Sequence, residues 1–183
     1  MVIRSMVFAS SADNIRRITA AFVVVWAFGL PPLSAAASDL PESSGDVILI
    51  VEGNIRSTNG AGRAQFDRAM LGMLGSHHIF TSTPWTDGVI DFEGVLISDV
   101  LSAVDAQGTA LEATALNDYK VKIDVADLQK YPVIIAMSAD GKPLTRRDKG
   151  PLWVIYPLDD YPEIEHMGKL WNMIWQLNRI VVQ

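Results

Sequence analysis

Residues 133–156 read VIIAMSADGKPLTRRDKGPLWVIY and contain the two clearest strands of the chain. The run at 133–137 is apolar and rich in β-branched residues, which predicts a buried strand. The DGKP motif at 140–143 predicts a tight turn. Residues 152–156 are again apolar, and Pro157 ends this second strand because proline has no backbone N–H to donate.

Outward from this stretch, short apolar runs bounded by turn residues predict further strands. These predicted strands cover residues 47–51, 78–83, 89–92, 113–116 and 120–123. The pair 113–116 and 120–123 flanks the turn-prone Asn117-Asp118, so we expect these two strands to lie side by side. The closing residues 171–182 suit a last strand, with a helix as the alternative.

Short helices are predicted between the strands. Residues 64–74 carry apolar side chains at helical spacing, and Gly75 follows as a C-terminal cap. A second helix is predicted over 99–104 with Ser98 as its N-cap, and a helical turn over 125–129. Many short strands with a few short helices indicate a β-rich α+β domain rather than a doubly wound α/β fold.

The N-terminus has the features of a secretory signal. Basic residues precede an uncharged apolar run at 18–30, and Ala35-Ala36-Ala37 offers a signal peptidase site. We therefore predict a signal peptide over 1–37, a flexible lead-in over 38–45 and one domain over 46–183. The alternative, an uncleaved membrane anchor, is disfavoured because the apolar run is shorter than the roughly 20 residues that span a bilayer.

These features predict a periplasmic or secreted protein with no stable membrane anchor after cleavage. The pair Arg16-Arg17 leaves the export route open between the general secretory and the twin-arginine pathways. Removing residues 1–37 takes away three Arg and one Asp, so the formal charge changes from -6 to -8. An acidic domain with scattered cations is not expected to bind nucleic acid.

The chain contains no cysteine. This excludes a disulfide framework, thiolate catalysis and thiolate ligation of a metal within this sequence. A domain of this length buries a sufficient core without disulfides.

An ordered series of motifs resembles the oxidoreductase molybdopterin-binding domain, the catalytic fold of the sulfite oxidase group. The motifs are FEGV at 92–95, ALNDY at 115–119, YPVIIA at 131–136, DGKPL at 140–144 and KGPLWVIYP at 149–157. With the closing residues, the resemblance covers about 78–183. It implies a single β-rich domain of the sulfite oxidase type, with mixed sheets and short helices, and molybdopterin as the cofactor of catalytic members.

The sequence departs from the family at the metal ligand. The resemblance implies that catalytic members of the family hold molybdenum with the pterin dithiolene and one cysteine. That cysteine lies just before a segment that corresponds to the one at Trp85 here. Here that stretch is FTSTPW at 80–85, and Thr81 or Ser82 occupies the ligand position. A hydroxyl is a hard donor that stays protonated, so it replaces a thiolate poorly. His78 lies close by in the sequence and is a candidate cofactor contact.

The densest group of cations lies in the loop at 140–150, which includes the tight turn, and is the candidate site for a phosphate or another anion. It comprises Lys142, Arg146, Arg147 and Lys149. Arg146 is the favoured contact because a guanidinium matches phosphate oxygens in pairs. The alternative is a solvated loop beside Asp140 and Asp148.

Other chemistry-bearing residues suggest less. His77 and His78 are adjacent, so on a strand they point to opposite faces, and we predict no histidine metal site. The acidic run at 159–165 is interpreted as a solvated loop.

The tryptophans of the domain divide into two groups. Trp153, Trp171 and Trp175 are expected in the core, whereas Trp85, in a turn that contains proline, is expected to line a cleft.

The leading hypothesis is a non-catalytic or altered ligand-binding or partner module, because no cysteine is present to ligate molybdenum. The alternative is a periplasmic molybdopterin-dependent oxidoreductase with a non-cysteine metal ligand, and a third is a structural interaction protein without a ligand. No cofactor is assigned from the residues, and molybdopterin is the one that the resemblance implies. Candidate partners are a small anionic ligand or a periplasmic protein.

Overall fold

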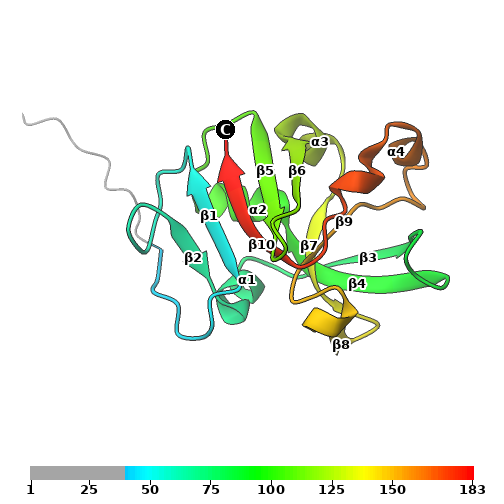
Figure 1. The fold of residues 1–183 in the computed structure, drawn as a ribbon, viewed down its shortest axis with the longest axis horizontal. Coiled ribbons are helices and arrows are strands. Elements are labelled where there is room, and N and C mark those ends of the chain that lie inside the picture. The colour runs from blue at the N-terminus through cyan, green and yellow to red at the C-terminus, as the bar shows by residue number, and fades with distance from the viewer. Residues whose placement is uncertain (1–39) are drawn as a thin grey trace, which may run out of the picture. The chain divides into compact units, whose positions relative to one another are not determined.

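The computed structural model describes residues 40–183, and the predicted signal peptide at 1–37 lies outside them (Figure 1). Its strands form two sheets. The first has the order β2-β1-β10-β5-β6, with bounds Ala64–Phe66, Leu49–Gly53, Leu177–Val182, Ala110–Ala115 and Lys120–Asp124. The second has the order β3-β4-β7-β8, and β9 also pairs with β7; their bounds are His77–Ser82, Val89–Leu96, Ile134–Ala139, Lys142–Pro143 and Trp153–Ile155.

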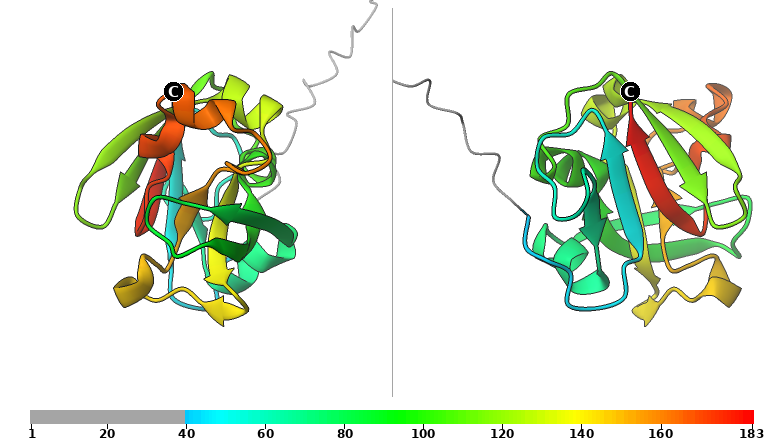
Figure 2. Two further views of the ribbon diagram at one scale, coloured as in Figure 1. Left: turned by 90° about the vertical axis from the view of Figure 1, so that its right-hand side faces the viewer. Right: turned by 60° about the vertical axis from the view of Figure 1, so that its left-hand side comes forward.

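The first sheet joins the two ends of the described chain. Strand β1 pairs in parallel with β10, with Val51 opposite Ile180, and β10 pairs in antiparallel fashion with β5. The right view of Figure 2 shows β1 in cyan beside β10 in red. The predicted pairing of β5 with β6 is confirmed, with Ala113 opposite Val121.

The second sheet contains both strands of the stretch 133–156. Strand β7 pairs with β9 in antiparallel register, with Ile135 opposite Val154, and all six residues of the paired stretches are buried. On its other side β7 pairs with β4, and the register shifts between Glu93 and Gly94. Strands β3 and β4 form a long hairpin that extends away from the first sheet in Figure 1.

The helices are short. Their bounds are Arg68–Met73 for α1, Ile97–Ala103 for α2, Val125–Lys130 for α3, Arg146–Asp148 for η1, Glu163–His166 for α4 and Lys169–Asn172 for η2. None of the helices in residues 40–183 has the length and apolar character needed to cross a membrane.

The helix predicted over 64–74 is wrong in its first part. Ala64 and Phe66 alternate with Gln65 and pair with β1, so these residues form the edge strand β2. Asp67 then caps α1, because its Oδ1 accepts the N–H of Met70 at 2.8 Å. The apolar spacing of the segment fits both structures, and pairing with β1 decides between them.

Other boundaries also differ from prediction; β1 begins at Leu49 rather than at residue 47, and β4 continues to Leu96 rather than ending at residue 92. Ser98 is not an N-cap, because α2 begins at Ile97, two residues earlier than predicted, and Leu96 occupies the cap position without a side-chain hydrogen bond. The last strand, β10, covers only the second half of 171–182. The first half begins with the last two residues of η2, and Gln176 has a positive φ of 53°, which interrupts the extended backbone before Leu177.

Both sheets contribute to one hydrophobic core, together with the buried faces of α1 and α2. Tyr131, Tyr156 and Phe92 are among the largest fully buried side chains. The domain is therefore β-rich α+β with two sheets and short helices, as the sequence predicts.

Residues 40–45, which fall in the predicted lead-in, contact the domain. The Oδ2 atom of Asp67 accepts the backbone N–H groups of Ser44 at 2.9 Å and Gly45 at 2.8 Å. These bonds, after the one from Met70, hold the pKa of the Asp67 carboxyl below its usual value.

Candidate functional site

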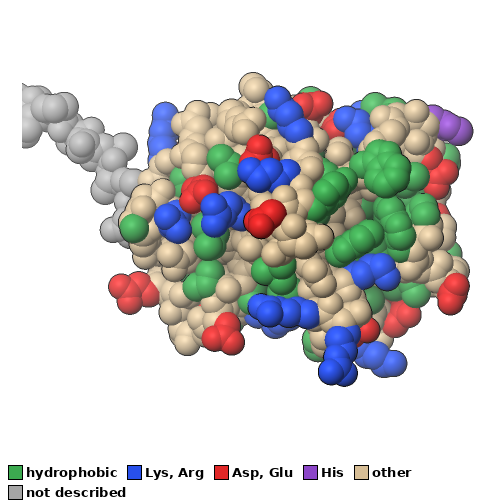
Figure 3. Space-filling model, viewed as in Figure 1, with side chains coloured by type: hydrophobic (Ala, Val, Ile, Leu, Met, Phe, Trp, Pro, Cys, Tyr) green, Lys and Arg blue, Asp and Glu red, His purple; other side chains and the backbone are tan. Residues whose placement is uncertain are grey.

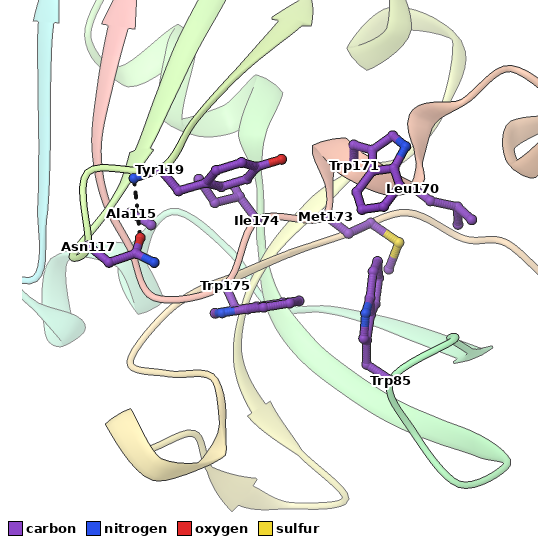
Figure 4. A pocket seen from close by; sticks show the side chains of 9 residues that line it. All are labelled: Trp85, Ala115, Asn117, Tyr119, Leu170, Trp171, Met173, Ile174 and Trp175. Atoms are coloured by element: carbon purple, nitrogen blue, oxygen red, sulfur yellow. Dashed lines mark hydrogen bonds between the residues drawn. The ribbon is translucent and has the colours of Figure 1, made fainter.

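A cleft lined mainly by aromatic and apolar side chains opens beside the end of the β3–β4 hairpin. Figure 3 shows hydrophobic side chains gathered around a hollow on the face between this hairpin and α4. The volume of the cleft is about 290 Å³. Its lining comprises Trp85, Ala115, Asn117, Tyr119, Leu170, Trp171, Met173, Ile174 and Trp175 (Figure 4).

Three separate segments supply these side chains. Trp85 comes from the turn between β3 and β4, Tyr119 from the turn between β5 and β6, and Trp171 from η2. Hydroxyl groups set the turn at Trp85. Thr83 Oγ1 accepts the N–H of Trp85 at 3.2 Å, and Thr86 Oγ1 accepts the N–H of Thr83 at 3.0 Å.

The segment that carries Trp175 is fixed on both sides of this residue. The carbonyl of Ile174 accepts the N–H of Val154 at 2.9 Å, and the N–H of Gln176 donates to the carbonyl of Lys149 at 2.9 Å. In addition, Trp153 Nε1 donates to the carbonyl of Met173 at 3.0 Å. This wall of the cleft is therefore built before any ligand arrives, which lowers the entropy lost on binding.

The indole rings pack edge to face. Trp85 and Trp175 have ring centroids 5.5 Å apart at an interplanar angle of 75°, and Trp85 packs against Trp153 at 6.4 Å and 61°. Behind them Phe92 supports Trp153 at 5.3 Å and 84°. Such pairs add stability beyond the area that they bury. Because Trp153 and Phe92 belong to the core, the aromatic wall is continuous with it.

The two residues at the expected metal-ligand position are already engaged. Thr81 is fully buried; its hydroxyl accepts the N–H of Asp159 at 3.1 Å and donates to the carbonyl of Ser82 at 3.2 Å. Asp159 in turn accepts the Ser82 hydroxyl at 2.7 Å and the Ser82 N–H at 3.0 Å. Asp159, which belongs to the acidic run that was predicted to be a solvated loop, thus fixes the end of β3 through hydrogen bonds.

These residues do not fit a molybdenum ion bonded to a protein side chain. The hydroxyl of Thr81 faces Asp159 and the Ser82 carbonyl, and both candidate donors are hard oxygens rather than a soft thiolate. Within residues 40–183, no group of three His, Cys, Asp or Glu side chains is arranged to hold a metal ion.

The two histidines of β3 diverge, as predicted. His77 Nε2 lies 3.5 Å from Asp99, whereas His78 Nδ1 lies 2.8 Å from Asp91 and the His78 ring stacks on Phe80 at 6.3 Å. The hydrogen bond to Asp91 raises the pKa of His78. His78 contributes with His77 and Phe80 to a separate, smaller cavity of about 230 Å³ and does not line the aromatic cleft.

The predicted basic cluster is divided by the structure. Lys142 lies on β8, and Arg146 and Arg147 lie exposed on η1. The Nζ atom of Lys149 lies 5.3 Å from the centroid of the Trp153 ring, next to the indole against which Trp85 packs. Lys149 is thus the member of the cluster that the structure brings to the aromatic wall.

Arg146 belongs to a different small cavity, of about 130 Å³, which also includes Asn178 and Leu116. Its carbonyl accepts the side-chain N–H of Gln176 at 2.9 Å, so η1 is attached to the segment after Trp175. The role of Arg146 as an anion contact stays a prediction.

Sequence reasoning placed Trp85 at a cleft and missed most of its partners. Trp153 is in the core as predicted, with 2% of its surface exposed, but Trp171 and Trp175 are 70% and 37% exposed. The prediction of buried positions for these two residues is therefore wrong, because Trp171 lies on η2 and Trp175 lies before the start of β10. Nothing in the sequence around Tyr119 indicates its place in the cleft.

Comparisons with known proteins agree with this fold. A family model described as oxidoreductase molybdopterin binding domain matches residues 59–159. The match begins earlier than the resemblance noted in the sequence and ends before η2 and β10. A search of curated proteins found no match.

Among solved structures, the chain is similar to the sulfane dehydrogenase SoxCD from Paracoccus pantotrophus, with a TM-score of 0.53 and 14% sequence identity. The match covers 73% of this chain and 37% of the other, so this chain spans little more than a third of that one. At this identity the similarity concerns the fold alone.

Proposed function

This chain belongs to the oxidoreductase molybdopterin-binding domain family, and we propose that it is a small-ligand binding module that does not bond molybdenum through a protein side chain. The observation that carries the proposal is the closed hydrogen-bonding of Thr81 and Ser82 with Asp159. A metal at this position would have to displace those bonds and would gain only a hydroxyl oxygen in return.

The aromatic cleft is the proposed ligand site. Its volume of about 290 Å³ is near the lower end for small-molecule pockets, which are mostly apolar with a few polar groups. The backbone bonds on either side of Trp175 hold its wall in place. A small ligand with an anionic group beside Lys149 is the favoured partner, and a periplasmic protein docked on the same aromatic face is the alternative.

We place the module outside the cytoplasm, in the periplasm or secreted. The support is the order of basic, apolar and small residues over 1–37. Expression of the full chain in a bacterial host tests this. The intact mass of the exported protein is expected to be that of a chain that begins at Ser38. Recovery of uncleaved protein from the membrane fraction would contradict it.

The function is tested by elemental analysis of the protein purified from a host that makes molybdopterin. Mass spectrometry for molybdenum and fluorescence of oxidised pterin are measured on the same sample. A cysteine-containing member of the family, expressed in the same host, is the control that the cofactor is supplied.

Molybdenum and pterin well below stoichiometric amounts, with a loaded control, are the expected result. Near-stoichiometric molybdenum and pterin would overturn the proposal. They would assign the chain to the oxidoreductases with an oxygen ligand or with the pterin alone holding the metal.

A further inference from the structure

The cleft has the arrangement of an aromatic cage. In Figure 4 Tyr119 and Trp171 lie above one space and Trp175 and Trp85 below it, with the Met173 side chain between Trp171 and Trp85. The rings of Trp85 and Trp175 stand at 75° to each other and form a corner. Aromatic faces carry negative electrostatic potential, and cages of this kind bind quaternary ammonium groups.

The polar groups that line the cage limit which cations it can bind well. None of its lining residues has a carboxylate, and Asn117 Oδ1 already accepts the N–H of Tyr119 at 3.2 Å. An ammonium that carries several N–H bonds would lose water here and find few acceptors, namely the Tyr119 hydroxyl and the second lone pair of Asn117 Oδ1, at a cost in free energy. A quaternary ammonium has no N–H to leave unpaired, so the cage favours it over a lysine-like amine.

A cation of the protein contacts a ring that supports the cage. Lys149 Nζ sits over the Trp153 ring at 5.3 Å, Trp153 packs against Trp85, and no carboxylate lies within 4.0 Å of the Lys149 ammonium among the described ion pairs. This charge opposes a simple cation in the cage. It attracts a ligand that also carries a carboxylate.

We propose that the aromatic cage binds a small betaine, with the quaternary ammonium among Trp85, Trp171, Trp175 and Tyr119 and the carboxylate directed toward Lys149. This inference names the ligand class of the proposed function and rests on it. The binding is non-covalent, and the wall that carries Trp175 does not need to move far, because its backbone is already fixed.

Calorimetric titration of the protein purified after expression of the full chain tests the ligand class. The probes are trimethylglycine, 3,3-dimethylbutanoate, glycine and choline. In 3,3-dimethylbutanoate a neutral carbon replaces the quaternary nitrogen of trimethylglycine, and the carboxylate is kept. Trimethylglycine is expected to bind about tenfold or more tightly than 3,3-dimethylbutanoate, because only the cation gains from the ring faces. Glycine and choline are expected to bind more weakly than trimethylglycine.

Variants then test the two halves of the site. Trp171→Leu, at a side chain 70% exposed, is expected to weaken trimethylglycine without unfolding the domain. Lys149→Gln is expected to weaken trimethylglycine and to leave choline unchanged or stronger. Phe80→Leu is the matched control, since Phe80 is an aromatic side chain 61% exposed outside the cleft.

Equal affinity for trimethylglycine and 3,3-dimethylbutanoate would overturn the inference, as would no binding of trimethylglycine. A loss of affinity in Phe80→Leu equal to that in Trp171→Leu would also overturn it. If the protein is free of molybdenum, any of these outcomes overturns the inference but leaves the proposed function standing. Near-stoichiometric molybdenum, in contrast, overturns the proposed function itself.

Discussion

At the scale of single residues, the pair of His78 and Asp91 links stability to pH. The hydrogen bond between His78 Nδ1 and Asp91 raises the pKa of His78 above 6.5, against the smaller opposing effect of desolvation, and the charges of Asp91 and Glu93 add to the rise. The contribution of this pair to stability is therefore fully present below pH 6.5. It is lost as the pH rises through the pKa of folded His78.

The substitution Asp91→Asn is expected to lower the pKa of His78 toward its ordinary value and to remove this dependence on pH. NMR titration of the His78 ring protons measures the pKa directly. Asp99→Asn is the control, because Asp99 faces His77 on the other side of β3. An unchanged pKa of His78 in Asp91→Asn would contradict the assignment.

The residues around Thr81 illustrate what sequence reasoning can find at this scale. The motif before Trp85 located the expected ligand position, and the absence of cysteine showed that it had changed. The engagement of Thr81 and Ser82 by Asp159 was not predictable, because Asp159 is 77 positions from Ser82 in the chain. An acidic loop residue gives no sign in the sequence that it pairs with a distant strand.

At the scale of elements, Gly94 allows β4 and β7 to approach at the point where their register shifts. A Cβ atom at this position would lie 2.0 Å from the carbonyl oxygen of Ile135 and 2.7 Å from the Cα atom of Ala136. Both are backbone atoms of the central strand, so they cannot move without disturbing the sheet. The close approach, rather than a special φ angle, requires glycine here.

Gly94→Ala is therefore expected to destabilise the domain by about 1–3 kcal/mol, the usual cost of overpacking a filled site. Urea unfolding measures the change as a lower midpoint at a similar slope. Gly72→Ala in α1 is the matched control, because nothing lies within 4 Å of the added methyl group. It is expected to be neutral or to stabilise the helix by up to about 1 kcal/mol, and equal effects of the two substitutions would contradict this account.

Elements were predicted best where a short run had one compatible structure. The apolar runs that became β7 and β9 are too strongly β-branched and too well bounded by turns to fold otherwise. The apolar spacing in residues 64–74 fits both a helix and a strand. Pairing with β1 decided that residues 64–66 form a strand, and a local sequence pattern does not reveal such a pairing. The closing segment failed for the related reason that a positive φ at Gln176 is not visible in the side-chain pattern.

At the scale of the whole domain, β10 is the middle strand of the first sheet. Its residues Leu177, Ile180 and Val182 are buried, and it hydrogen-bonds to β1 on one side and β5 on the other. Removal of residues 177–183 would leave two separate strand pairs with exposed apolar faces. Isolated strand pairs are at best marginally stable in water.

This truncation is expected to abolish the cooperative thermal transition and the native far-UV circular dichroism spectrum. Arg179→Ala on the same strand is the control, because its exposed ion pair with Glu52 contributes at most about 1 kcal/mol. A truncated chain that still unfolded cooperatively would contradict the central role of β10.

The fold class and most strands of the domain were predictable from the sequence, but the order of strands in the first sheet was not. The parallel pairing of β1 with β10 joins residues about as far apart as the described chain allows, with Val51 opposite Ile180. Local patterns carry no information on such a pairing. Apart from Trp85, the lining of the cleft escaped prediction for the same reason, because three distant segments have to meet before it exists.

The position of β10 also sets the order of events as the chain is made. A ribosome that has synthesised β1, β2, β5 and β6 has produced four strands of a five-strand sheet without the one that joins them. Folding of this sheet therefore waits until residue 182 has left the ribosome. Long-range pairing of this kind slows folding and leaves apolar strands uncovered meanwhile, so we expect the unfinished sheet to be prone to aggregation until β10 pairs.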